Sequence, residues 1–530
     1  MTNMSLPHQV FDAVIFGSGL AGLSCARRLA MQGKKVLVLE KSKEIGGHLL
    51  PFERAGAFFE VGLHYIADTQ PGGHYHNAMS DLGIQLEEIQ LDAHFETLHF
   101  EKDGGTGRED FTYTRPLSVF IMQLLKSFPS KERSIKKYFE IMESVWGVMR
   151  KVAFPVTVPG AFKALLSSEN KVAIGKAAFQ SLGECLDELK IDGELREILV
   201  MHHVLIGVPP SRVSAVLHMI VQRYYFEGAC FVRGGGKALI EALVHPEVEY
   251  VVSCDARFEC DHQLMSLNGN ARYKVHVQDG RIVASKNIVW TPDPRLLPRA
   301  AESLNLPTLL RERLKRAETP HALVVGYFAT RKPLLDYGLK NCNHWLMGQL
   351  DSEQCYKEQN PLVLADKAPL YVSTGSLRDP DALMDPNKLG AQGVFQAMFL
   401  CPAESSIWGG EDVSNYRVPE SKGGFGRNYR NLKQEVLKTL TARVQRTWPE
   451  IEGELVWTEL GTPLTHHRYL NSLTLNGYGF APTVQDFLWR RPGVETGVEG
   501  LYLCGAHTRP SHGIVTALLN GVGLANSLCT

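Results

Sequence analysis

The 530-residue sequence lacks any CxxC pair among its ten cysteines, and their spacing matches no metal-binding pattern. Two adjacent histidine pairs, at residues 202–203 and 466–467, also lack a third ligand at metal spacing, so no metal site is predicted. Scattered cysteines of this kind favour buried free thiols in a reducing, cytoplasmic compartment.

The sequence also lacks an excess of charge of one sign and lacks long apolar runs. The formal net charge is -1, which excludes a strongly basic surface and predicts no nucleic-acid partner. No run reaches the roughly 18 apolar residues of a membrane span. Residues 1–10 show no basic start followed by a long apolar stretch, so no signal peptide is predicted. Contact with a membrane surface stays open.

Local patterns place one β-α-β unit at the start of the chain. Residues 11–16 form a short apolar run typical of a buried strand, and residues 36–39 form a second one. Between them, residues 23–32 favour a helix, which Gly33 ends as a C-terminal glycine should.

The turn between the first strand and the helix carries the fingerprint G-x-G-x-x-G. Its first glycine permits a tight turn, its second lets the backbone approach a pyrophosphate, and its third lets helix and strand pack closely. The helix N-terminus adds free N–H groups and a partial positive charge. The predicted pyrophosphate contacts are Gly17, Gly19, Leu20, Ala21 and Gly22.

The residues after the second strand decide between NAD and FAD. Glu40 lies about twenty residues beyond the fingerprint, where a carboxylate accepts hydrogen bonds from ribose hydroxyls. A second glycine pair, Gly46-Gly47, resembles the flavoprotein pattern in which backbone passes close to the flavin's phosphates and ribityl chain. We therefore predict FAD, with Lys41 and His48 as further contacts.

Several segments resemble one flavoprotein superfamily. Residues 56–66, G-A-F-F-E-V-G-L-H-Y-I, resemble the G-x-x-F-[DE]-x-G-x-H-Y-I stretch of the retinol saturases. These enzymes belong to the phytoene desaturase and carotenoid isomerase superfamily. Residues 233–239, 373–380, 462–465 and 500–505 resemble further segments of that superfamily in the same order. The pattern is closest to that of the retinol saturases.

The resemblance implies an α/β fold with a discontinuous Rossmann-type FAD-binding domain built from residues 1–75, 226–300 and 456–530. Residues 76–225, with helices expected at 116–128, 134–149 and 181–207, would form a helical insert of the substrate domain. Residues 301–455 would complete that mixed α+β domain, with a loop around 402–426.

The C-terminal flavin segment departs from the superfamily pattern at one point. Many relatives carry an acid after the closing strand, but here Gly505 and Ala506 are followed by His507 and Thr508. Either of these two side chains could bond a ribityl hydroxyl instead. The next helix should direct its N-terminus at the flavin, which adds Gly513, Ile514 and Val515 to the predicted contacts.

Three residues are candidates for catalysis. The resemblance brings His64 and Tyr65 to the flavin, and His512 lies close to the C-terminal flavin segment. A histidine there could shift the flavin potential or serve as an acid. Arg509 is a further residue expected to line the flavin.

Residues 116–166 combine apolar clusters with basic flanks. Such a region either forms the core of the substrate domain with a solvated face or lies in a membrane interface. Polyene desaturases resemble monotopic membrane proteins in this region, so both alternatives stay open.

The sequence therefore predicts an FAD-dependent oxidoreductase that saturates, desaturates or isomerises C=C bonds of a hydrophobic polyene, isoprenoid-like or acyl substrate. A flavin amine oxidase and a non-catalytic, flavin-stabilised binding protein are the alternatives, because fold does not choose among activities. Only one G-x-G-x-x-G lies in a β-α-β context, so electrons must exchange with an unidentified partner by transient contact.

We expect the flavin to be bound noncovalently. Purified protein reconstituted with excess FAD should be yellow, and heat denaturation should release the colour into the supernatant. Colourless protein after reconstitution would contradict the prediction of FAD, and colour that stays with the precipitate would contradict noncovalent binding.

Overall fold

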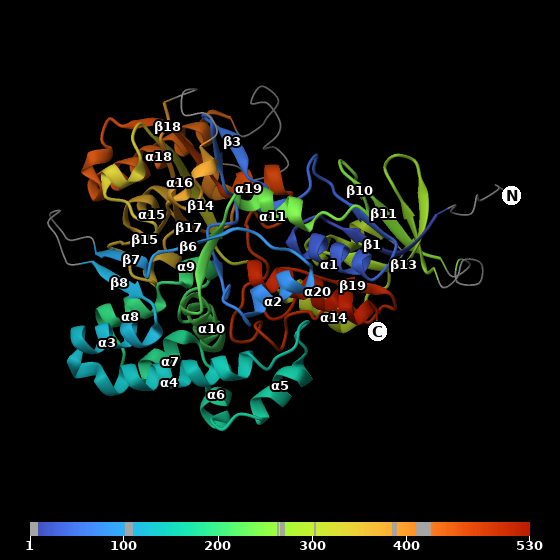
Figure 1. Cartoon of the computed structure of the whole chain (residues 1–530), viewed down its shortest axis with the longest axis horizontal. Coiled ribbons are helices and arrows are strands. Elements are labelled where there is room, and N and C mark those ends of the chain that lie inside the picture. The colour runs from blue at the N-terminus through green and yellow to red at the C-terminus, as the bar shows by residue number, and fades with distance from the viewer. Residues whose placement is uncertain are drawn as a thin grey trace.

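A computed structural model describes residues 9–100, 110–261, 264, 271–301, 304–383, 390–409 and 426–529. Two seven-stranded sheets and a group of helices make up the molecule. In Figure 1 the first sheet lies on the right, the second at the upper left, and helices α3 to α8 below the second sheet. The predicted α/β fold class is confirmed.

The first sheet joins strands from three distant parts of the chain. Parallel strands run in the order β10-β2-β1-β13-β19, and the antiparallel strands β12 and β11 extend the sheet from the first half of β13. One long strand thus holds together the beginning and the end of the chain. The strands are β1 (Val10–Phe16), β2 (Val36–Leu39), β10 (Val248–Val251), β11 (Arg257–Cys260), β12 (Tyr273–His276), β13 (Ile282–Trp290) and β19 (Leu501–Leu503).

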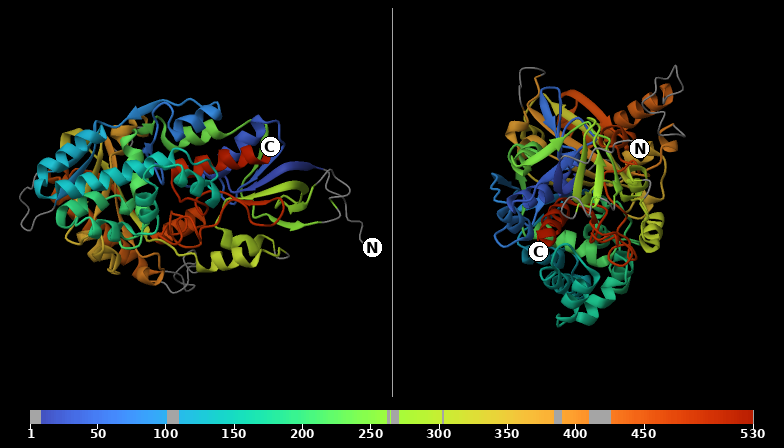
Figure 2. Two further views of the ribbon diagram at one scale, coloured as in Figure 1. Left: turned by 90° about the horizontal axis from the view of Figure 1, so that it is seen from below. Right: turned by 90° about the vertical axis from the view of Figure 1, so that its right-hand side faces the viewer.

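Helices α1 (Leu20–Met31) and α20 (Ile514–Cys529) pack against each other beside this sheet, as Figures 1 and 2 show. Their contact is close because Gly521 of α20 lies where the helices meet. A Cβ added at Gly521 would lie 2.0 Å from the Ser24 hydroxyl oxygen and 2.5 Å from the Ala21 carbonyl oxygen. The two ends of the chain therefore form one structural unit.

The second sheet has the order β18-β14-β17-β16-β15-β7-β8. Side chains alternate along β14, so that Val324 and Phe328 face one apolar cluster while Val325 and Tyr327 face another. Because both faces are covered, β17 is buried along its whole length. The strands are β7 (His94–Phe100), β8 (Phe111–Thr114), β14 (Ala322–Thr330), β15 (Asn343–Met347), β16 (Leu370–Ser373), β17 (Gly393–Cys401) and β18 (Leu455–Gly461).

Smaller elements connect the two sheets and cover their faces. The short strands are β3 (Phe52–Arg54), β4 (Ala57–Phe59), β5 (Ile66–Ala67), β6 (Glu88–Gln90) and β9 (Ala229–Val232). The helices around the sheets are α2 (His74–Asp81), α11 (Gly235–Leu243), α13 (Leu297–Ala300), α14 (Thr308–Arg316), α15 (Pro361–Lys367), α16 (Gly375–Arg378), α18 (Arg427–Thr447) and α19 (Pro463–Leu470).

The helical region agrees with two predicted helices and corrects a third. Helices α3 (Leu117–Ser127) and α4 (Glu132–Met149) lie where they were expected. The single helix expected at 181–207 is wrong, because Lys190 and Gly193 adopt positive φ and interrupt it. The segment forms α7 (Leu182–Glu188), α8 (Gly193–Val200) and α9 (His203–Ile206), and α5 (Val158–Leu166), α6 (Lys171–Ala178) and α10 (Ala215–Phe226) complete the region.

Three further expectations concern the start of the first helix, one loop and membrane-spanning helices. The first helix begins at Leu20 rather than Leu23, since the fingerprint itself forms its first turn. Most of the loop expected at 402–426 lies outside the described residues. In the described part of the chain, no helix is both long and apolar enough to cross a membrane.

We expect Gly521→Ala to lower the free energy of unfolding by about 1–3 kcal/mol, because the new methyl group would overlap backbone atoms of α1. Gly147 in α4 is a matched control, since a Cβ there would meet no atom within 4 Å. Gly147→Ala should raise stability by about 0.5–1 kcal/mol. Thermal unfolding of both variants tests this, and equal melting temperatures would show that the α1–α20 contact tolerates a side chain.

Candidate functional site

A cavity of 1490 Å³ lies among the first sheet, the second sheet and the helical region. It is lined by the fingerprint, by the C-terminal segment and by apolar side chains of α9 and α10. Most of the predicted site residues line it: Gly17, Gly19, Leu20, Ala21, Glu40, Lys41, Gly47, His48, His64, Tyr65, Gly505, Ala506, His512, Gly513, Ile514 and Val515.

The fingerprint glycines differ in what they face. A Cβ at Gly22 would lie 2.1 Å from the Gly17 carbonyl oxygen, so Gly22 serves the close packing of helix on strand. A Cβ at Gly19 would meet no protein atom within 4 Å and would project into the space at the N-terminus of α1. That terminus has no side-chain cap, which leaves its N–H groups for an anionic group.

Glu40 directly follows β2 and is nearly buried. Its carboxylate accepts hydrogen bonds from the Ser18 N–H at 2.9 Å, the Ser18 hydroxyl at 2.6 Å and the Ser42 N–H at 2.7 Å. These bonds tie the end of β2 to the fingerprint turn and hold a negative charge at the cavity wall. A ribose hydroxyl would find an oriented acceptor there.

The glycine pair after Glu40 is held against the same turn. The Gly46 N–H donates to the Ser18 carbonyl and hydroxyl oxygens, each at 3.1 Å. A Cβ at Gly46 would lie 2.3 Å from Ile240 Cδ1, so Gly46 packs against α11 rather than facing the cavity. A Cβ added at Gly47 would lie 3.2 Å from Gly19 Cα. Gly47 itself lines the cavity.

The C-terminal segment distinguishes His507 from Thr508. The Thr508 hydroxyl donates to the Gly505 carbonyl at 2.7 Å and accepts from the Asn520 amide at 3.1 Å, so it is engaged inside the protein. His507 lines the cavity, and its Nε2 lies 3.6 Å from an Asp293 carboxylate oxygen. Of the two, His507 is placed to reach a ligand. Burial lowers the His507 pKa to about 4.

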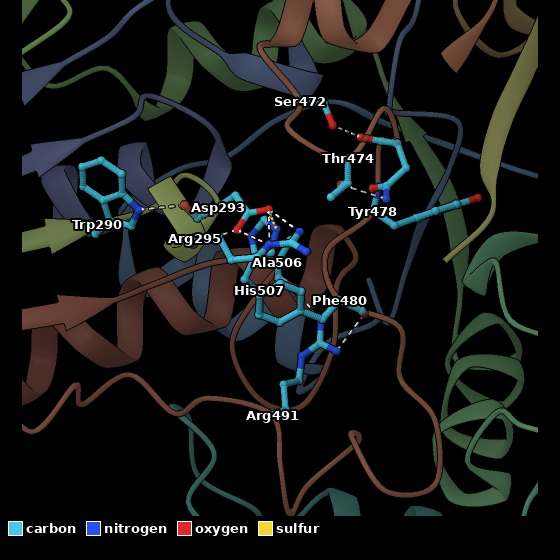
Figure 3. A network of polar contacts seen from close by, with 11 residues as sticks. Trp290, Asp293, Arg295, Ser472, Thr474, Tyr478, Phe480, Arg491, Ala506 and His507 are labelled. Carbon is cyan, nitrogen blue, oxygen red and sulfur yellow. Dashed lines mark hydrogen bonds and ion pairs between the residues drawn. The ribbon is translucent and has the colours of Figure 1, made fainter. Parts of the chain in front are cut away.

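A fully buried arginine fixes the backbone of this segment, as Figure 3 shows. Arg491 donates to the carbonyl oxygens of Phe480 at 2.8 Å, Ala506 at 2.5 Å and Thr508 at 2.9 Å. Burial lowers the Arg491 pKa to about 9. Arg509, expected at the flavin, instead donates to the Leu488 carbonyl and is not among the described residues that line the cavity.

The two candidate histidines are both deeply buried. Burial, and then the charge of Arg378, lowers the His64 pKa to about 3. Burial, followed by the charge of Arg491, lowers the His512 pKa to about 3 as well. Both imidazoles are therefore neutral at neutral pH. His512 also lies 4.8 Å, ring to ring, from Tyr478.

Tyr65 is held from two sides. Its ring stacks on Tyr225 at 4.2 Å, and its hydroxyl donates to a Glu96 carboxylate oxygen at 3.0 Å. The preceding carbonyl, of His64, accepts a hydrogen bond from buried Arg378, which also bonds the Asn343 side chain. Burial, aided by the charge of Glu96, raises the Tyr65 pKa well above its usual range.

Sequence reasoning missed the residues that hold Tyr65. Glu96 was not singled out in the sequence, and His202 was considered only as a metal ligand. The signal available was Glu96 itself, the one acid in the segment His94–Phe100. Among the described residues no three His, Cys, Asp or Glu side chains gather as a metal site would require. The ten cysteines are free, eight of them buried.

Comparison with known proteins places this geometry in a family. The flavin-containing amine oxidoreductase family matches residues 20–361. All-trans-retinol 13,14-reductase of Danio rerio is 24% identical, over 93% of this chain and 82% of its own. Prolycopene isomerase of Daucus carota is 21% identical, over 97% of this chain and 79% of its own. These two relatives fit the superfamily that the sequence resembles.

Solved structures show the same fold. An oxidoreductase from Methanosarcina mazei matches with a TM-score of 0.61 at 14% identity, covering 97% of this chain and 99% of its own. A putrescine oxidase variant matches with a TM-score of 0.62 at 13% identity, covering 98% and 99%.

Gly19→Val should weaken FAD binding by at least about 100-fold, because a branched side chain would fill the space at the α1 N-terminus and displace N–H contacts worth about 1.5–3 kcal/mol each. The cofactor-free protein should still fold, with its melting temperature lowered by a few degrees at most, since a Cβ at Gly19 meets no protein atom within 4 Å and the N-cap change costs only about 1 kcal/mol. Gly19→Ala should lose less affinity. Unchanged FAD binding by Gly19→Val, measured by fluorescence titration, would show that the cofactor lies elsewhere.

The glycine turn, the oriented carboxylate and the two helix N-termini at one cavity fit an FAD molecule, and the family match covers most of the chain. The predicted cofactor and the prediction of an FAD-dependent oxidoreductase are thereby confirmed. This chain belongs to the flavin-containing amine oxidoreductase family.

Proposed function

We propose that the protein is an FAD-dependent enzyme that saturates, desaturates or isomerises a C=C bond of a long, mostly apolar polyene, isoprenoid-like or acyl molecule. The observation that carries this proposal is the composition of the cavity. Beyond the cofactor segments its lining includes Val204, Leu205, Leu217, Ile220 and Val221. A hydrocarbon chain placed along such a wall gains about 0.8 kcal/mol per buried methylene.

The protein's own residues would divide the work. We propose that the fingerprint residues Gly17, Gly19, Leu20 and Ala21 and the α1 N-terminus bind the pyrophosphate, and that Glu40 orients the ribose. The α20 N-terminus would stabilise negative charge on the flavin. FAD supplies, when bound, a carrier that accepts or donates hydride. The remaining requirement is one proton at the substrate carbon.

Tyr65 is the residue we propose for that proton. It lines the cavity, and its raised pKa keeps the hydroxyl protonated at neutral pH. His64 and His512 would act as neutral groups that shape the site, because their lowered pKa values leave no imidazolium to serve as an acid. The names of the two relatives, a retinol reductase and a prolycopene isomerase, support a polyene substrate.

A membrane surface is the source that we propose for such a substrate. In the region of residues 116–166, Phe120, Leu124 and Trp146 face the core, which agrees with the alternative of a substrate-domain core. Four exposed apolar side chains lie on or next to α5 and α6, at the lower edge of Figure 1. They are Phe162, Leu166, Val172 and Phe179, with Lys163, Lys171 and Lys176 among them in the sequence.

Two aromatic residues link this surface to the cavity. Exposed Phe179 stacks on Trp489 at 5.6 Å, and Phe487, two residues before that tryptophan, lines the cavity. Apolar groups flanked by lysines suit the interface of an anionic bilayer. A lipid-like molecule leaving the bilayer would then have a short path to the site.

Amine oxidation is the second candidate. The observation that favours it is the group of aromatic rings in the cavity, where Tyr65, Tyr225 and Tyr371 lie together. Such rings can surround a small amine as well as a polyene. The substrate test below distinguishes the two candidates.

The test is a substrate panel containing all-trans-retinol, prolycopene and an unsaturated acyl chain in liposomes, with putrescine as the amine. Dithionite-reduced enzyme should be reoxidised by a polyene, or a polyene should be isomerised, with products followed by mass and double-bond position. Reduction of the oxidised flavin by putrescine, with no change in any lipid, would overturn the proposal and favour amine oxidation.

A variant sharpens this test. Val221→Phe would narrow the cavity along its apolar wall. It should raise KM for the polyene by about tenfold, given the usual 1–3 kcal/mol cost of overpacking. Leu309→Phe is the control, because Leu309 is exposed on α14 and lies away from the cavity lining. Equal KM values in both variants would show that the substrate does not lie along α10.

A further inference from the structure

A buried pair of titratable side chains lies behind Tyr65. Glu96 on β7 and His202, just before α9, are both wholly buried. The His202 Nε2 atom is 3.0 Å from one Glu96 carboxylate oxygen and 3.1 Å from the other. The second of these oxygens also accepts the hydrogen bond from the Tyr65 hydroxyl. The three side chains thus form a continuous chain of hydrogen bonds.

A contribution to stability does not account for the burial of this pair. His202 stacks on Tyr225 at 5.4 Å, and the rings of Tyr113 and Trp345 meet it edge-on at 5.6 and 6.0 Å. Burying an acid and a base in such a core is costly, and an apolar pair of similar volume is often as stable or more so. The pair is therefore a candidate for function.

Tyr65 connects the pair to the cavity. Tyr65 lines the cavity, whereas Glu96 and His202 are wholly buried and are not among the described residues that line it. A proton held between His202 and Glu96 can pass to the Tyr65 oxygen over two hydrogen bonds without crossing solvent. The Arg378 guanidinium, 6.0 Å from the centre of the Tyr65 ring, would lessen the cost of a transient negative charge there.

We propose that Glu96 and His202 are positioning and proton-reloading residues for Tyr65 in the saturation of a C=C bond. This inference rests on the proposed function. FAD, when bound and reduced, would supply the hydride for one new C–H bond, and the Tyr65 proton would form the other as the Tyr65 O–H bond breaks. The proton shared by Glu96 and His202 then moves to the Tyr65 oxygen. Solvent returns a proton through the cavity before the next turnover.

The test uses FAD-loaded enzyme that turns over all-trans-retinol in liposomes anaerobically, with excess dithionite as the reductant, so that each enzyme completes many turnovers. Tyr65→Phe keeps the ring and should slow product formation by about 100-fold or more, the usual range for loss of a general acid. Glu96→Gln should slow it by about tenfold, and Glu96→Asp should restore part of the rate. Retinol affinity and the dithionite reduction rate should stay within about threefold of wild type, so the loss falls on kcat rather than KM.

Tyr138→Phe is the matched control. Its hydroxyl is also buried and bonded, to Gln222 at 2.8 Å, but Tyr138 is not in the described cavity lining. This variant should form product at the wild-type rate. The solvent isotope effect on turnover in D2O should grow in Glu96→Gln as reloading becomes rate-limiting.

A second measurement needs neither flavin nor substrate. Nitrogen-15 NMR of histidine-labelled, cofactor-free protein should show one resonance, absent in His202→Gln, that shifts toward a neutral imidazole in Glu96→Gln. If the His202 resonance is unchanged in Glu96→Gln, the proposal that Glu96 and His202 share a proton is overturned. If the wild-type enzyme acts on a polyene and both Tyr65→Phe and Glu96→Gln act at the wild-type rate, the proton relay is overturned but the proposed function is not. A wild-type enzyme that acts on no polyene would overturn the proposed function and the relay with it.

Discussion

The close approach of α1 to the first sheet is the constraint on which the rest of this structure depends. Gly22 lies so near the Gly17 carbonyl that no side chain fits between them, and Gly521 brings α20 equally near to α1. These contacts place two helix N-termini at one cavity, although their residues are almost five hundred positions apart in the chain. Two partial positive charges that converge in this way suit a cofactor that is anionic at its phosphates and becomes negative at its ring on reduction.

Much of this arrangement could be predicted from the sequence because its determinants are local. The strand, the glycine turn and the helix lie within about twenty residues, and each glycine has a geometric reason. Glu40 was predicted from spacing, although its bonds to Ser18 were not. Gly46 shows the limit of such reasoning. It belongs to the motif, but its missing side chain makes room for Ile240 rather than for the cofactor.

The substrate side of the cavity could not be predicted in the same way, because its contacts join distant segments. Glu96 meets His202 across 106 positions, and Arg378 reaches the His64 carbonyl across 314. Neither pairing has a periodic or motif signature. The prediction of a single helix at 181–207 was wrong for a related reason. The apolar residues of this segment are buried on several sides of three short helices and not along one face of a long helix. His202 lies in the break between α8 and α9.

Burial acts in opposite directions on the groups that surround the proposed substrate. It lowers the pKa values of His64 and His512 and raises that of Tyr65, so all three are neutral at neutral pH. A neutral wall suits a hydrocarbon, because a charge left facing it would be desolvated without a partner. Proton transfer nevertheless needs a charge to appear for a moment. The structure meets both requirements by keeping Glu96, His202 and Arg378 one layer behind the wall, in contact with Tyr65 and with the backbone beside it. The polar groups that could balance a transient phenolate are thus present, while His64, Tyr65 and His512, which the substrate would meet, remain uncharged.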